Sequence, residues 1–146
     1  MARFQFSLEK VLRWRGMELV AEQAKLEHLV REQLRLQGLR AQLSADKSKL
    51  LVSLSTMPDL RGEDLRAATA HNLLLKRQAE RLIGLQMKCE QELAVQRTNF
   101  RAAKQRFRLL EELKERKFTE WRHDQAAQLE ALASESYLAN WSRDQV

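Results

Sequence analysis

The stretch Thr56-Met-Pro-Asp-Leu-Arg-Gly62 holds the single proline and one of the four glycines in a chain of 146 residues. Proline cannot continue a helix, and a short segment with proline and glycine between long regular segments marks a turn. Leu, Ala, Glu, Lys, Arg and Gln, which are strong helix formers, fill most of the other positions. A chain with one credible reversal must form few, long elements. We therefore predict two helices joined by a turn at about residues 56–62.

The segment before the turn has the features of one long helix over about residues 7–55. The Ser7 hydroxyl can accept a hydrogen bond from a free backbone N–H, and Glu9 suits the positive end of the helix dipole. Leucines then recur every seven residues, the spacing that keeps side chains along one seam of a coiled coil. This row consists of Leu29, Leu36, Leu43, Leu50 and Met57.

The segment after the turn, about residues 63–138, contains two heptad rows. One row is Leu65, Asn72, Ala79, Gln86, Leu93, Phe100 and Phe107, and the other is Ala68, Leu75, Leu82, Cys89, Gln96, Ala103 and Leu110. Heptads sustained over more than three repeats indicate a coiled coil, although they fit a dimer as well as a hairpin. The predicted fold class is all-α: residues 1–146 form one antiparallel coiled-coil hairpin whose second helix is longer.

The unequal arms predict an unpaired end. If residues 55 and 63 lie opposite each other, paired positions sum to roughly 118, and the chain beyond about residue 114 has no partner. Phe118, Trp121, Leu129 and Leu132 should then lack an intrachain neighbour and be available to another protein. Two alternatives are that the C-terminal segment frays or that it folds back on the hairpin.

The aromatic residues all fall at the open end of the hairpin under this pairing. Five of them, Phe4, Phe6, Trp14, Phe118 and Trp121, are the predicted partner-binding residues of that end. Rings that merely fill a wider end of the coiled coil are the alternative. At the tip, Leu51, Leu60, Leu73 and Leu74 cannot all point into a two-helix seam. These four leucines are the predicted second binding surface.

Charge and composition restrict the function. A net charge of +6 admits an acidic protein, nucleic acid or an anionic membrane as a partner. The basic residues Arg97, Arg101, Lys104, Arg106 and Arg108 could follow a nucleic-acid backbone, or could simply form a solvated face beside Phe100 and Phe107. No apolar run is long enough to span a bilayer, and the N-terminus does not resemble a signal peptide. We expect a cytosolic protein.

We expect no catalytic, cofactor or metal site, and therefore no enzyme. The four glycines are isolated, so no phosphate-binding loop is present. His28, His71 and His123 are far apart in sequence. The pairing brings His28 opposite Cys89 or its neighbour, which we interpret as a surface histidine beside a cysteine in the seam.

The opening residues Arg3-Phe-Gln-Phe-Ser-Leu-Glu-Lys-Val-Leu12, followed by Arg15 and Glu18, resemble the start of the FliJ family of flagellar export proteins. That family begins with two alternating phenylalanines, a Leu-x-x-Val-Leu step and an arginine. Its second arm is similar to the stretch with Lys104, Leu110, Leu113 and Arg116. The chain departs from the family at His71 and Asn72, where an aromatic is common, and at Glu130-Ala-Leu-Ala133, where an Asp-Glu pair is usual.

The resemblance implies a two-helix coiled coil similar to the shaft of a rotary ATPase. It implies a non-enzymatic part of the bacterial flagellar type III protein export apparatus, needed for motility. The expected partners are the hexameric export ATPase at the open end, the membrane export gate at the tip, and export chaperones. The expected location is the cytoplasmic side of the cell membrane at the flagellar base, with membrane association through partners and no nucleic acid. The alternatives are a related injectisome or rotary-ATPase shaft, and a basic hairpin that binds nucleic acid.

Overall fold

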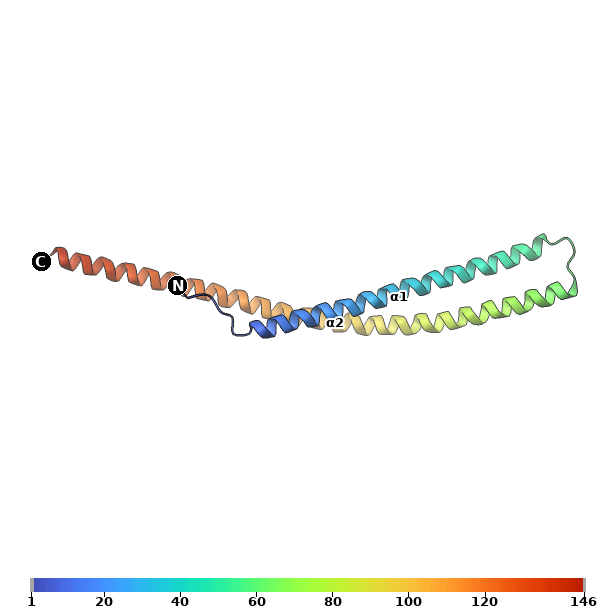
Figure 1. Cartoon of the computed structure of the whole chain (residues 1–146), viewed down its shortest axis with the longest axis horizontal. Coiled ribbons are helices and arrows are strands. Elements are labelled where there is room, and N and C mark those ends of the chain that lie inside the picture. The colour runs from blue at the N-terminus through green and yellow to red at the C-terminus, as the bar shows by residue number, and fades with distance from the viewer. Residues whose placement is uncertain (1, 146) are drawn as a thin grey trace. The chain divides into compact units, whose positions relative to one another are not determined.

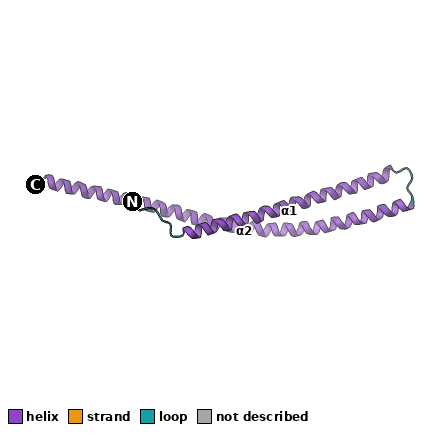
Figure 2. Cartoon of the chain, viewed as in Figure 1, coloured by secondary structure: helices purple, strands orange, loops and turns teal. Residues whose placement is uncertain are grey.

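The computed structural model describes residues 2–145, which form two long helices (Figure 1). Helix α1 spans Glu9–Thr56 and helix α2 spans Gly62–Asp144, with 48 and 83 residues respectively. Figure 2 shows loop before α1 and between the two helices, and no strand occurs among the described residues. The prediction of an all-helical, antiparallel hairpin with a longer second helix is confirmed.

The helix ends differ slightly from the expected ones. Ser7 lies in a turn before α1, where the backbone N–H of Glu9 donates to the carbonyl of Phe6 at 3.1 Å. At the start of α2 the Asp64 carboxylate accepts a hydrogen bond from the backbone N–H of Arg61, at 3.3 Å. Such a contact satisfies a donor that the first helical turn leaves free. Helix α2 also continues beyond the expected end near residue 138.

The helices contribute to two compact units, which are described separately. The central unit consists of residues 21–101, and the terminal unit consists of residues 1–20 and 102–146. The helix α1 contributes its first residues to the terminal unit and the remainder to the central unit, and α2 continues through both.

In the central unit the two helices pack through the predicted heptad rows. Its core contains Leu36, Leu82, Cys89 and Leu93, and Leu26, Leu29 and Leu43 pack against it. Contacts across the seam run in opposite directions along the two helices, from the Glu22–Gln96 pair to the Arg40–Gln86 pair. Leu36, with 2% of its surface exposed, is the most completely buried large side chain of the described residues. Met57 departs from the predicted row, because it lies beyond the end of α1 and is exposed.

In the terminal unit a smaller core and two ion pairs join the helices. Leu12 and Ala103 are buried, and Ala103 continues the heptad row of α2 that contains Leu82 and Cys89. Glu9 pairs with Lys114 at 2.9 Å, and Glu18 pairs with Arg106 at 3.2 Å. These pairs bring the start of α1 beside α2 near residue 114.

The close approach of α1 to an aromatic ring explains why a glycine occupies position 16. A Cβ atom added at Gly16 would lie 3.3 Å from Cε2 of Phe107. That separation is tighter than an ordinary van der Waals contact, so a larger residue here would displace the ring. The absence of a side chain at Gly16 therefore lets the helix backbone pack directly on Phe107.

Candidate protein-binding surfaces

Three aromatic rings meet in the terminal unit, where the chain before α1 lies against α2. The ring of Phe4 contacts Phe118 edge to face, with centroids 5.2 Å apart and planes at 71°. The same ring is 5.9 Å from Trp121. Phe118 and Trp121 stack on each other at 5.9 Å because a spacing of three residues places them on one face of the helix. We call Phe4, Phe118 and Trp121 the aromatic cluster.

The cluster shows that the prediction of an unpartnered Phe118 and Trp121 is wrong. The pairing rule treated residues 2–8 as if they rose like a helix, and the structure shows that they are not helical. Non-helical chain can advance up to about 3.3 Å per residue, against about 1.5 Å in a helix. A short segment can therefore reach further along α2 than the pairing rule allowed. Leu129 and Leu132, in contrast, are exposed as expected.

The aromatic cluster is only partly covered. Phe118 remains 40% exposed, while Phe4 and Trp121 are half-buried. The guanidinium of Arg122 lies 5.9 Å from the centre of the Phe118 ring, within the range of a cation–π contact. The cluster therefore presents an aromatic surface with a positive charge at its edge.

The other two aromatic residues predicted for this end differ from the cluster. Phe6 is half-buried, and its carbonyl accepts the hydrogen bond that begins the turn into α1. Trp14 lies on α1, is exposed, and has the guanidinium of Arg15 4.6 Å above its ring. Within the described residues no ring contact joins Trp14 to the cluster. The structure therefore brings together three of the five predicted residues.

The last part of α2 carries further exposed apolar side chains that sequence reasoning did not select as a site. They are Tyr137, Leu138 and Trp141. Their signal in the sequence is the spacing of three and four residues that joins Trp141 to the other two on a helix. Large apolar residues gathered on an exposed helix are typical of contact surfaces.

The four leucines predicted for the tip belong to the central unit and are all exposed. They are Leu51, Leu60, Leu73 and Leu74. Leu75, which follows Leu73 and Leu74 directly, is buried in the seam. The heptad pattern therefore separates seam from surface correctly at this point. That the exposed leucines bind a partner stays a prediction.

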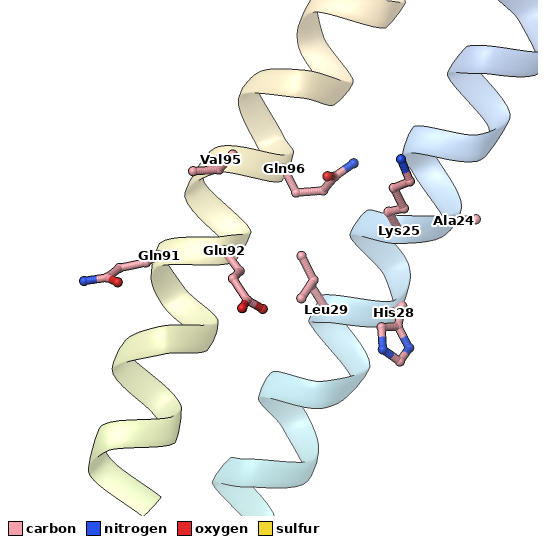
Figure 3. Close-up of a pocket in the computed structure, with 8 residues that line it drawn as sticks. All are labelled: Ala24, Lys25, His28, Leu29, Gln91, Glu92, Val95 and Gln96. Carbon is pink, nitrogen blue, oxygen red and sulfur yellow. The ribbon is translucent and has the colours of Figure 1, made fainter.

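An open groove of about 740 Å³ lies between the helices of the central unit (Figure 3). It is lined by Ala24, Lys25, His28 and Leu29 of α1 and by Gln91, Glu92, Val95 and Gln96 of α2.

Gln96, which lines this groove, makes a part-buried polar contact with α1. The side-chain amide of Gln96 reaches towards α1 in Figure 3 and donates to the backbone carbonyl of Glu22 at 3.0 Å. The same amide donates to the Glu22 carboxylate. This hydrogen bond, assisted by Lys25, holds the pKa of the Glu22 carboxyl below its ordinary value. The contact fixes the alignment of the two helices.

Cys89 is a seam residue with an unreactive environment. Its thiol is buried and lies 3.7 Å from the backbone carbonyl of Leu29. Burial, and then the negative charge of Glu32, raises the pKa of the Cys89 thiol. No group of three metal-ligating side chains occurs in the part of the chain that the structure describes.

The basic residues proposed for nucleic acid are exposed, and one of them is paired. Arg106 contacts Glu18, which also accepts from Arg15 at 2.8 Å. This pairing lowers the free positive charge of the basic face.

Neither helix, as described between residues 2 and 145, combines the length and the apolar character that a membrane span requires.

The chain was compared with protein-family models, with curated proteins and with solved structures. None of the three comparisons finds a match.

Proposed function

We propose that the chain is a FliJ-like stalk of the bacterial flagellar export apparatus, which binds the hexameric export ATPase through its terminal unit and the membrane export gate through its tip. The observation that carries the proposal is the aromatic cluster. Phe4 belongs to the N-terminal stretch that resembles the family, and it packs on Phe118 and Trp121 of the second helix. The residues of the resemblance thus contribute to a partly exposed aromatic surface.

Energetics support a role for this surface in binding. Complete burial of a large apolar side chain contributes roughly 1.5 to 3 kcal/mol. Two or three such anchors could supply much of a micromolar affinity before the costs of association are subtracted. Arg116, Lys117 and Arg122 lie beside the cluster in sequence and could meet acidic loops that line an ATPase ring. Aromatic and arginine side chains are also the residues most enriched among interface hot spots.

A stalk of this kind would act without catalytic groups of its own. A protein that binds one arrangement of ATPase subunits better than another shifts the population towards it. We therefore expect the purified chain to hydrolyse no nucleotide alone and to stimulate the export ATPase. Export chaperones would bind elsewhere on the exposed helical surface.

The test measures ATP hydrolysis by the export ATPase across a concentration series of the chain. We expect Phe118→Ala with Trp121→Ala to remove most of the stimulation, and truncation after residue 114 to remove it entirely. The matched control is Tyr137→Ala with Trp141→Ala, which removes two exposed aromatic residues of α2 outside the cluster.

The outcomes separate the proposal from its alternatives. Normal stimulation by the Phe118 and Trp121 double variant would place the ATPase contact elsewhere. No stimulation and no binding by the unaltered chain would remove the export ATPase as its partner. Salt-dependent binding to duplex DNA of arbitrary sequence would favour a nucleic-acid hairpin instead.

A further inference from the structure

We propose that residues 2–8 form a displaceable strap, which partly covers Phe118 and Trp121 and limits the access of apolar ligands to them. The proposal depends on the proposed function only for the identity of the protein that would displace the strap. The occlusion itself is a property of the terminal unit and can be measured without a partner.

The aromatic contacts between the strap and α2 are made by Phe4. Phe4 is half-buried although it lies outside both helices, and its contacts with Phe118 and Trp121 account for that burial. Phe118 and Trp121 stack side by side on α2, and the Phe4 ring packs against both. An incoming apolar side chain that packed on the parts of these two rings covered by Phe4 would have to replace Phe4.

Hydrogen bonds attach the strap to α1 and not to α2. In the described chain, the carbonyl of Phe6 accepts from the N–H of Glu9, and the carbonyl of Leu8 accepts from the N–H of Leu12. Within the described chain, residues 2–8 make no hydrogen bond to α2. The salt bridge between Glu9 and Lys114 fixes only the point where the strap leaves the helix. Hydrogen bonds thus join the strap to the start of α1. Its aromatic contacts with α2 are made by the Phe4 ring.

Such an attachment favours opening. Aromatic pairs add a modest stabilisation to the apolar area that they bury, so a segment whose aromatic contacts with α2 come from one ring exchanges with open forms. A site that is open for roughly one tenth of the time binds its ligand about tenfold more weakly than a permanently open site. The strap therefore sets the affinity of the surface that it covers.

The test removes the ring of the strap and reports on Trp121. In a background with Trp14→Phe and Trp141→Phe, Trp121 is the only tryptophan that remains. Phe4→Ala should increase acrylamide quenching of its fluorescence and increase binding of the apolar dye anilinonaphthalene sulfonate up to about tenfold. Gln5→Ala, which alters an exposed neighbour in the strap, is the matched control and should change neither reading. Circular dichroism verifies that each variant keeps its helices.

Three results with the isolated chain would overturn the proposal. Equal quenching of Trp121 in the Phe4→Ala variant and its parent would show that the strap does not cover this residue. Increased quenching with unchanged dye binding would show that the covered surface is not a ligand site. Quenching of the parent that does not change on dilution would show that the strap covers its own chain. Quenching that rises on dilution of the parent, but not of the Phe4→Ala variant, would show cover by a second copy and would also overturn the proposal.

Binding to the export ATPase then tests the consequence for a protein partner. We expect Phe4→Ala to bind more tightly than the unaltered chain, by up to about tenfold. Weaker binding would show that Phe4 belongs to the interface. It would contradict the proposal that the strap and the ATPase compete for Phe118 and Trp121. If no variant binds the ATPase, the proposed function fails, whereas the quenching and dye measurements still decide whether the strap exists.

Discussion

At the scale of single residues, the hairpin depends on a small number of buried side chains. A two-helix structure has one seam, so most apolar residues of both helices stay at least partly exposed. The leucines of α1 illustrate the contrast, because Leu36 is 2% exposed while Leu34, two residues earlier, is 61% exposed. Mutations at these two positions remove the same atoms from different environments.

We predict that Leu36→Ala destabilises the chain by about 2 to 3 kcal/mol, in the lower part of the range for buried leucines because an open seam can collapse around the cavity. Leu34→Ala should change the free energy of unfolding by less than about 0.5 kcal/mol. Urea unfolding followed by circular dichroism measures both. Equal effects of the two substitutions would contradict the packing of the central unit.

A second prediction concerns the hydrogen bond from Gln96 to Glu22. This bond lowers the pKa of Glu22 in the folded chain below 4.5, the ordinary value. The bond therefore stabilises the folded chain fully at pH values above the pKa that Glu22 has in the unfolded chain. This stabilisation is lost as the pH falls through the lower pKa that Glu22 has in the folded chain. The unaltered chain should melt at a higher temperature than Gln96→Ala near pH 7, and the difference should shrink near pH 3.

Gln91→Ala provides the control for that measurement, because Gln91 lines the same groove but is exposed. Its melting temperature should follow that of the unaltered chain at both pH values. A difference between Gln96→Ala and the unaltered chain that is the same at both pH values would show that the carboxylate plays no part.

At the scale of elements, each helix separates a buried row from a broad exposed surface. In α2 the row from Leu75 to Ala103 is buried at every seventh residue. The residues beside this row are free for contacts with other proteins. The two helices can therefore change their surfaces without loss of the hairpin.

The tip tests this separation with three consecutive leucines. We predict that Leu73→Asp together with Leu74→Asp keeps the helical content and abolishes binding to the export gate. Leu75→Asp should instead unfold the neighbouring part of the hairpin, because a carboxylate in the buried seam has no partner to compensate its lost hydration. Circular dichroism and a binding assay with the gate protein separate the two effects. Retained gate binding by the double variant would remove the tip from the proposed function.

At the scale of the whole molecule, the chain has little core for its length. Several positions at heptad spacing are polar or charged. Gln33, Arg40 and Lys47 recur every seven residues in α1, and Gln86 and Gln96 belong to the two predicted rows of α2. Arg40 and Gln86 contact each other across the central unit at 3.4 Å, and both lie towards the solvent. Such layers specify the alignment of the helices more than they stabilise them.

We therefore predict a gradual thermal transition at a modest temperature and a monomeric or weakly associating chain. Circular dichroism should show a helical spectrum, and its melting curve should be broad because polar layers weaken cooperation between segments of the seam. Sedimentation over a range of concentrations measures association. A substantial strand signal, or a sharp transition that accompanies a stable dimer, would contradict this prediction.

The sequence by itself determined the helices, the turn and most of the seam. Pro58 and Gly62 mark the reversal, and heptad spacing identifies the buried row because helix geometry repeats locally along the chain. Periodicity fails where the chain leaves the helix, so the sequence placed Met57 in the seam and left Phe118 without a neighbour. The contact of Phe4 with Phe118 depends on the path of a non-helical segment, and the groove lined by Ala24 is formed by residues of two distant segments. Those features arise from packing between residues far apart in sequence, so only the tertiary structure decided them.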